Sequence, residues 1–574
     1  MIKKGKKVVA LFTTFLLSAS LMAGCTGGDN TTKNSVDEGT SNGASANGDS
    51  LEPITFTFFG EDPISNWNDM NDEVSKEITA RTGVTLDAEF AVGDPAAKIA
   101  MMAASGQYPD IISAKGDINK LVDAGAVIDL TDLINEHAPN IKKVMGDYMN
   151  RAKYSLEDPA IYALPTYSAI DEVKFNAGGG SQLQHRVVKE AGYPEIRTVE
   201  DYERVIKEYL EKHPTDENGN KNIGVSLLAD DWRIFITVTN NAMYHTGKPE
   251  DGEFKIDQET YEATYHYRDP AEKEYFRWLN HINAEGLLDP ESFTQKYDEY
   301  KAKIASGRVL GLIDQDWQIG EAINSLSASG QFDKTYGYYP VTLSKDIKHP
   351  YFWPTGFMGG YGIAISSTAK DPVRIIKFLD FLASEEGQIL TNWGIEGKHY
   401  VVENGKRVVP KEVQDRINSD SNAFYKESGL GNYWNIGVHY GDGVKDSTGN
   451  YFTKNNPDME DTSNNTAEKE TLAAYKIKNW KDLFPKEDEF KEKAYGAGWN
   501  ISTPADSKAT IIGKKMQDIT WKRIPQIITA KPDQFDQLWD DYMKEIEASG
   551  VEEMEKEFTK YVQGRVELWG SGGK

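Results

Sequence analysis

Residues 54–113, ITFTFFGEDPISNWNDMNDEVSKEITARTGVTLDAEFAVGDPAAKIAMMAASGQYPDIIS, decide the fold class. Apolar residues alternate or run together in residues 54–59, 84–91 and 110–113, which predicts three short strands. Between them, residues 67–81 and 95–105 have the spacing of helices, and each segment is followed by a glycine-containing stop. Strand, helix and parallel strand form the unit of a parallel sheet, so the sequence predicts an α/β fold.

Four helices farther along the chain are predicted from apolar stripes at helical spacing. Thr198 caps the first, and Asp269-Pro270 begins the second. We assign the stripes to core packing, because one apolar face is what a helix buries in a globular protein. Their members are Tyr202, Val205, Ile206, Tyr209 and Leu210; Phe276, Leu279 and Ile282; Ile375, Phe378, Leu379 and Leu382; Phe535, Leu538, Trp539, Tyr542 and Ile546.

Composition excludes several classes of protein. The 574 residues are 39% hydrophobic and 27% charged, which suits a folded chain with more than one domain. Asp and Glu total 90 against 64 for Lys and Arg, a net charge of −26, so no nucleic-acid partner is expected. The single cysteine allows neither an internal disulfide nor a cysteine-based zinc site.

The N-terminus has the layout of an export signal. Lys3, Lys4, Lys6 and Lys7 precede an apolar run over residues 8–21, and Met22-Ala23-Gly24-Cys25 resembles the lipobox of bacterial lipoproteins. We therefore predict a signal peptide over residues 1–24, lipidation of Cys25, and a flexible polar tether over residues 25–50. The lipid anchor would be the only membrane attachment, at the extracellular face of the cell membrane. Removal of the four lysines leaves 60 basic against 90 acidic residues, a net charge of about −30.

Catalytic motifs are nearly absent from the sequence. It contains no nucleophile elbow, no phosphate-binding loop and no paired-histidine zinc motif. Asp314 and Asp316, placed on one face of a predicted strand, are the best candidates for a glycosidase-like acid and nucleophile. We favour the simpler interpretation that they are solvated acids at a strand end or bind hydroxyl groups. No catalytic residue and no cofactor are therefore predicted.

Aromatic residues beside polar neighbours are abundant outside the predicted core stripes. The chain has 12 Trp, 29 Tyr and 22 Phe, and many stand next to an acid, an amide or a glycine. A sugar ring offers an apolar face and a rim of hydroxyl groups, so its receptor needs flat aromatic side chains with hydrogen-bonding groups nearby. The residues we expect to bind such a ligand are Glu61, Asn66, Trp67, Trp232, Asp316, Trp317, Trp353 and Tyr361.

Several segments resemble the family 1 extracellular solute-binding lipoproteins of Gram-positive bacteria. They are the lipobox, GQYPDI at 106–111, EGLLDPE at 285–291, residues 359–387, NWGIEGKHY at 392–400 and the closing segment 536–558. The resemblance implies a two-lobe periplasmic-binding-protein-like fold, with a hinge, a cleft between the lobes and no enzymatic activity. It also implies an oligosaccharide ligand and the permease subunits of an ABC transporter as partners, with the protein acting as a monomer.

The resemblance also suggests how the chain divides between the lobes. Residues 51–165 would begin the N-terminal lobe, 166–345 the C-terminal lobe, 346–390 would return to the first, and 391–574 would complete the second. Two alternatives stay open: an extracellular carbohydrate-active enzyme, and a receptor for a peptide or a metal chelate.

One loop resembles the calcium loop of oligosaccharide-binding relatives. Asp216, Asn218, Asn220 and Asn222 occupy alternate positions and offer the oxygen ligands that Ca²⁺ prefers. The later acidic ligand is missing, because Gly224, Val225 and Leu227 stand where a carboxylate is expected. We therefore predict an empty polar turn and no metal.

Overall fold

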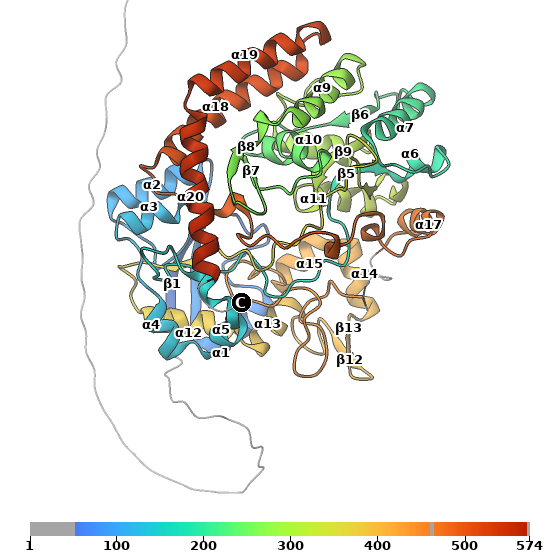
Figure 1. Cartoon of the computed structure of the whole chain (residues 1–574). Coiled ribbons are helices and arrows are strands. Elements are labelled where there is room, and N and C mark those ends of the chain that lie inside the picture. Colours follow the sequence, from blue (N-terminus) through green and yellow to red (C-terminus); the bar gives the residue numbers. More distant parts are fainter. Residues whose placement is uncertain (1–51, 458, 460–463, 571–574) are drawn as a thin grey trace, which may run out of the picture. The chain divides into compact units, whose positions relative to one another are not determined.

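The computed structural model describes residues 52–457, 459 and 464–570 (Figure 1). Within this part of the chain, no helix is long and apolar enough to cross a membrane. The predicted signal peptide, Cys25 and the tether lie outside the described residues.

The first sheet confirms the strands predicted from residues 54–113. Its strand order is β2-β1-β3-β11-β4. Strand β1 pairs in parallel with β2 and β3, whereas β11 pairs antiparallel with both β3 and β4. The strands are β1 (Ile54–Gly60), β2 (Val84–Phe90), β3 (Ile111–Ser113), β4 (Leu164–Pro165) and β11 (Gly362–Ile365).

The helices between these strands are α1 (Glu73–Thr82) and α2 (Pro95–Ser105). Helix α2 has the predicted bounds, but α1 begins later than residue 67. Asp69 and Met70 have φ angles of 59° and 57°, which break a right-handed helix. Asp72 then caps α1 by accepting a hydrogen bond from the Ser75 N–H at 2.7 Å.

The second sheet has the order β10-β5-β9-β6. Strands β6 and β9 are parallel, and β5 is antiparallel to both β9 and β10. Helices α7 and α9 begin where the sequence predicts, with a capping box at Thr198 and an N-cap at Asp269. The elements are β5 (Gly179–Gln184), β6 (Ile223–Ser226), β9 (Val309–Gln315), β10 (Tyr336–Tyr339), α7 (Val199–Lys212) and α9 (Pro270–Ala284).

Each sheet has its own hydrophobic core. The first contains Phe56, Ile111 and Ile363, and the second contains Leu183 and Leu310. Trp539 is 4% exposed within the second core, which confirms its assignment to packing. The C-terminal helices that supply this core are α18 (Lys508–Thr529), α19 (Phe535–Ala548) and α20 (Val551–Gly570).

The chain alternates between the two cores. The predicted division places residues 391–574 in the second lobe, whereas Val413, Phe424, Tyr433 and Ile436 of this stretch are buried in the first core. The reason is that the short helices α14 (Lys411–Ser419) and α15 (Ser421–Ser428) bury their apolar side chains there. The chain contributes buried residues to the second core again from Leu472 onward.

Candidate functional site

Four side chains gather where strands of the first sheet end. Because β1, β3 and β4 run in the same direction, their carboxyl ends share one edge of the sheet, and the antiparallel β11 begins there. Glu61 follows β1, Lys115 lies just beyond β3, Tyr167 lies beyond β4, and Tyr361 precedes β11. Ligands of α/β proteins bind at such an edge, so we call it the first strand-end edge.

Aromatic rings from distant parts of the chain meet at the first strand-end edge. The ring of Tyr167 lies 5.1 Å from Trp434 and 6.0 Å from Tyr361 between centroids. Tyr361 in turn lies 5.4 Å from Trp499, and its hydroxyl donates to the Trp499 carbonyl at 3.2 Å. Trp434 is 47% exposed and Trp499 is 39% exposed, so both offer apolar surface to a ligand.

Glu61 is the one predicted acid at this edge, and one oxygen of its carboxyl group is unsatisfied. Its backbone N–H donates to the Ser113 carbonyl at 3.2 Å, but its buried Oε1 has no hydrogen-bond partner. Burial, with Asp117 close by, raises the pKa of Glu61 from 4.5 to about 8. Near neutral pH this side chain is therefore a protonated group that can donate one hydrogen bond and accept another.

Asp62 and Lys115 supply a second polar group beside Glu61. The Lys115 Nζ lies 2.5 Å from Asp62 Oδ1, and the Tyr167 hydroxyl donates to Asp62 Oδ2 at 2.9 Å. The lysine also lies 5.4 Å from the centre of the Tyr167 ring. These contacts hold Tyr167 in place next to the strand ends.

The second sheet presents an equivalent edge. Strands β6, β9 and β10 end there and β5 begins there, which places Asp316 and Trp317 directly after β9. Trp232 follows β6 and lies with its ring 6.0 Å from that of Trp317, at an interplanar angle of 18°. The exposed fractions are 44% for Trp232 and 62% for Trp317. Two predicted residues 85 positions apart in the sequence thus form one exposed aromatic surface at what we call the second strand-end edge.

Asp316 immediately precedes Trp317 at the start of α11 (Asp316–Ala328). Its N–H donates to the Gly178 carbonyl at 2.8 Å, and the Tyr338 hydroxyl donates to Asp316 Oδ1. A Cβ atom at Gly178 would lie 3.2 Å from Asp316 Oδ2, so the glycine leaves room for the carboxylate. Burial raises the pKa of Asp316 to about 6, against the opposing effect of the Tyr338 hydrogen bond.

The structure corrects the interpretation of Asp314 and Asp316 as neighbours on one strand face. Strand β9 ends at Gln315, and Asp316 is the first residue of α11 (Asp316–Ala328). Asp314 is buried rather than solvated, and its oxygens accept from the Tyr300 hydroxyl at 2.7 Å and the Gln318 amide at 2.8 Å. Asp314 therefore helps to hold the fold and has no free oxygen directed to a substrate.

For three other predicted residues, no ring contact with the two aromatic groups is found among the described residues. Trp67 packs at the periphery of the first core, 6.1 Å from Phe90 and 6.0 Å from Tyr433, and Asn66 beside it is half-buried. Trp353 stacks on Phe490 at 4.7 Å, and its indole N–H donates to the Lys491 carbonyl at 2.6 Å. The role of these three in binding stays a prediction.

The loop that resembles a calcium site satisfies its own polar groups. Asp216 Oδ1 accepts from the N–H groups of Asn218 and Asn220 at 2.9 and 2.8 Å, and Oδ2 accepts from the Asn220 side chain at 3.0 Å. Among the described residues, no group of three His, Cys, Asp or Glu side chains could hold a metal ion. The donor set does not fit Ca²⁺ well, because it carries one carboxylate that already has three donors.

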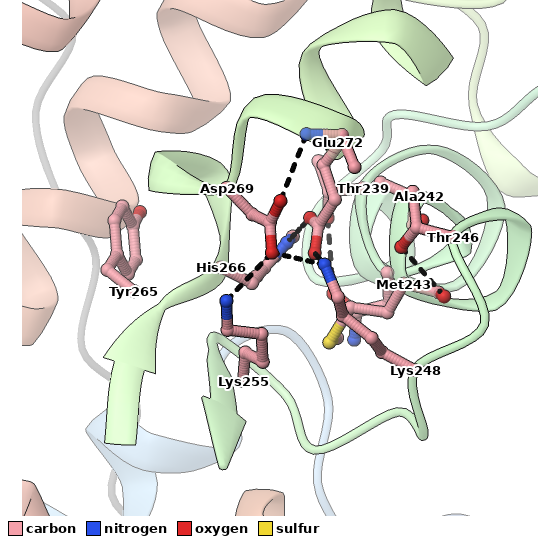
Figure 2. Close-up of polar contacts among 12 residues, drawn as sticks. Thr239, Ala242, Met243, Thr246, Lys248, Lys255, Tyr265, His266, Asp269 and Glu272 are labelled. Atoms are coloured by element: carbon pink, nitrogen blue, oxygen red, sulfur yellow. Dashed lines mark hydrogen bonds and ion pairs between the residues drawn. The ribbon is translucent and has the colours of Figure 1, made fainter. Parts of the chain in front are cut away.

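A partly buried ionic cluster in the second lobe has a structural role (Figure 2). Asp269 caps α9 and binds both Lys248 and Lys255, the latter at 2.7 Å, while His266 pairs with Glu272. Burial opposes ionisation of Asp269, but the hydrogen bonds from the two lysines lower its pKa to about 2. The charged side chains of the cluster are paired with one another, so we infer that the cluster stabilises the second lobe.

Two cavities lie elsewhere on the described chain. One of 1120 Å³ lies between α7 and α9, and one of 460 Å³ is lined by residues 151–157 and by α20. None of the eight predicted binding residues lines either of these two cavities. The candidate site is thus defined by the two strand-end edges and their exposed aromatic rings.

Residues 73–393 match the profile of a family described as bacterial extracellular solute-binding protein. The chain belongs to this family. The fructooligosaccharide ABC transporter substrate-binding protein FusA of Streptococcus pneumoniae is 22% identical to this solute-binding protein over 397 residues, 62% of this chain and 68% of FusA. Lipoprotein LipO of Bacillus subtilis is 22% identical over 404 residues, 68% of this chain and 73% of LipO.

Solved structures show the fold of this solute-binding protein. The alginate-binding protein AlgQ2, solved without calcium ion, has a TM-score of 0.61 at 18% identity and matches 90% of this chain and 99% of its own. FusA in complex with kestose has a TM-score of 0.63 at 18% identity, with 89% and 99% covered. The predicted α/β, periplasmic-binding-protein-like fold is confirmed. Solute-binding proteins are not enzymes, so the alternative of a carbohydrate-active enzyme is set aside.

Several residues of the site were missed from the sequence. Tyr167, Trp434 and Trp499 complete the aromatic group of the first strand-end edge, and Asp62 and Lys115 supply its ion pair. Lys115 could have been found, because it lies two residues after the predicted strand at 110–113, whereas Tyr167 follows β4, which the sequence did not predict. Trp434 lies in a turn and Trp499 in a single turn of 3-10 helix, and the sequence spacing of such short segments does not indicate which lobe they join.

Proposed function

We propose that this solute-binding protein captures an extracellular oligosaccharide and delivers it to an ABC transporter. The observation that carries the proposal is the exposed, stacked pair of Trp232 and Trp317, with Asp316 immediately before Trp317 in the chain. Indole rings stack on the apolar faces of sugars, while a carboxyl group binds their hydroxyls, so this pair offers both parts of a sugar site. The names of FusA and AlgQ2, relatives in sequence and in fold, record sugar ligands for those proteins.

The second part of the proposal is closure of the lobes around the ligand. Residues 166–178 and 340–361 each connect the first strand-end edge to the second. A few residues in such connections can absorb the rotation of a hinge. Ligand that contacts both edges would favour the closed state, which the permease subunits would recognise.

We also propose that Cys25 carries the lipid that retains the protein at the extracellular face of the membrane. The lipobox motif supports this assignment, as does the sequence similarity to lipoprotein LipO. One acyl chain binds a membrane only weakly, so stable anchoring needs more than one chain on the cysteine.

The test is binding of the purified protein without its lipid to a glycan array, followed by calorimetry with each hit. We expect a saturable oligosaccharide ligand that is recovered intact, together with a change in tryptophan fluorescence. Binding of peptides or metal chelates in place of every sugar would overturn the oligosaccharide proposal and leave the family assignment in force.

A further inference from the structure

We propose that Arg565 is a positioning residue of the sugar site, because it holds Trp499 where that ring meets Tyr361 at the first strand-end edge. Arg565 lies in α20, and we expect it to act through Trp499 rather than by contact with the ligand. This inference rests on the proposed function and adds the residue that fixes one side of its site.

The guanidinium of Arg565 is bonded to one short stretch of chain. Its Nη1 donates to the side-chain oxygen of Asn500 at 2.5 Å and to the Ala497 carbonyl at 3.3 Å, while its Nη2 donates to the Asn500 carbonyl at 2.8 Å. These acceptors belong to residues on both sides of Trp499 in the sequence. The planar fork of arginine can reach them together, which the compact ammonium group of a lysine cannot.

The charge of Arg565 has no counter-charge. In the described part of the chain, no carboxylate oxygen lies within 4.0 Å of its guanidinium. Burial lowers the pKa of Arg565 to about 9, so the side chain is still charged at neutral pH. A buried charge without an ion pair is costly, and an apolar side chain is often the more stabilising choice at such a position. Arg565 is therefore better explained by the backbone that its bonds fix, on both sides of Trp499, than by the space that it fills.

The bonded stretch is linked in turn to Tyr361 and the residues before it. The Tyr361 hydroxyl donates to the Trp499 carbonyl at 3.2 Å, and the centroids of the two rings lie 5.4 Å apart. The Asn500 side-chain amide donates to the Gly359 carbonyl at 3.2 Å. A Cβ atom at Gly360 would lie 2.8 Å from that amide nitrogen, so the two segments meet where a side chain would separate them. Contacts therefore run without a break from α20 to the first strand-end edge.

Trp499 is also anchored to the second lobe through the residues that precede it. Asp251 accepts from the Gly498 N–H at 2.8 Å, and the same carboxylate binds Lys493 and the Tyr495 hydroxyl, each at 2.7 Å. Tyr495 is buried in the second core. The backbone of Trp499 therefore belongs to the second lobe, although its ring lies at an edge of the first sheet.

The aromatic group of the first strand-end edge is thus divided between the lobes. Trp434 lies in the sequence between Tyr433 and Ile436, both buried in the first core, whereas Trp499 is held by the second lobe. A rotation of the lobes about the hinge would change the distance between these two exposed rings. The bonds of Arg565 determine where the second-lobe ring stands, so they also determine how a sugar can lie across both.

The first test needs no ligand. In protein labelled with 5-fluorotryptophan, fluorine NMR gives a signal for each tryptophan environment, and Trp499→Phe identifies the signal of Trp499. Arg565→Lys keeps the charge but loses the fork, so we expect it to shift or broaden that signal and to leave the signals of Trp232 and Trp317 in place. Arg565→Met removes the buried charge together with the bonds, so it should keep the fold and give the same change. The exposed Arg204→Lys on α7 is the matched control, in which none of the three signals should move.

The second test asks whether Arg565 acts on the ligand through Trp499. Calorimetry with kestose, and with each neutral hit from the glycan array, measures the affinity of the wild type, Arg565→Lys, Trp499→Ala and the double variant. We expect each single variant to bind at least tenfold more weakly, and the double variant to bind no more weakly than Trp499→Ala. Thermal midpoints recorded on the same samples show whether the proteins are folded.

The outcomes separate this inference from the proposed function. An unmoved Trp499 signal in either folded Arg565 variant would overturn the inference, as would losses of affinity that add up in the double variant. If neither Arg565 variant folds, the residue serves stability alone and the inference is overturned as well. If no sugar binds the wild type, the oligosaccharide function fails, while the fluorine signals still decide whether Arg565 positions Trp499.

Discussion

Replacement of Glu61 by glutamine should stabilise the protein, and more so as the pH rises. The folded protein holds a proton on Glu61 up to a pKa of about 8, whereas the unfolded chain releases it near 4.5. Between these values the unfolded state binds fewer protons, so the wild-type free energy of unfolding falls as the pH rises. The contribution is fully present below pH 4.5 and is lost as the pH rises through 8. Glutamine matches the protonated side chain in shape and cannot ionise, so the variant escapes this loss.

The expected size follows from the shift and from 1.36 kcal/mol per pKa unit. The cost of keeping Glu61 protonated is about 1 kcal/mol at pH 5 and about 3 kcal/mol at pH 7. Urea unfolding of both proteins at the two pH values should thus show a stability difference that grows by about 2 kcal/mol. The exposed Glu412→Gln serves as the control, in which no such growth is expected. A stability difference between the wild type and the Glu61→Gln variant that does not change with pH would refute the burial argument.

The remaining predictions concern the ligand, the lipid and the metal. Trp317→Ala should weaken sugar binding by about 1–3 kcal/mol, judged from base stacking, and leave the thermal midpoint nearly unchanged, because the ring is 62% exposed. Trp353→Ala should lower the midpoint through the lost stack on Phe490, and calorimetry will show whether affinity falls as well. Cys25→Ala should release the protein into the medium, and its retention in the membrane fraction would contradict the anchor. Neither Ca²⁺ nor a chelator should shift the thermal midpoint, because Asp216 already accepts hydrogen bonds from residues of its own loop. A shift of several degrees would restore the calcium interpretation.

The sequence predicts most of the local structure of this protein. Strand and helix periods, with caps at Thr198 and Asp269, place elements close to their observed bounds, because these signals lie within a few residues of each other. The late start of α1 escaped prediction, since it depends on left-handed backbone at Asp69 and Met70.

The binding site was less predictable because it joins distant segments. The sequence favoured Trp317 and Trp232 for their polar neighbours, and their stacking is consistent with that reasoning. Trp67 also has a polar neighbour, and Trp353 was favoured because it precedes a glycine-containing turn, yet their rings pack on Tyr433 and Phe490. Residues far away along the chain decide whether an indole ring is covered or exposed. A local sequence pattern contains no information about these residues.

The alternation of the chain between two cores has a consequence for folding during export. The second core joins Leu183 to Val562, so its contacts close loops of several hundred residues. Chains dominated by such distant contacts fold slowly, and this core is incomplete until its last helix has emerged. If the predicted signal peptide directs export of an unfolded chain, the protein crosses the membrane before it folds. Because the core of the second lobe needs α20, this lobe would stay unfolded, and the chain able to cross the membrane, until almost the whole chain has been exported.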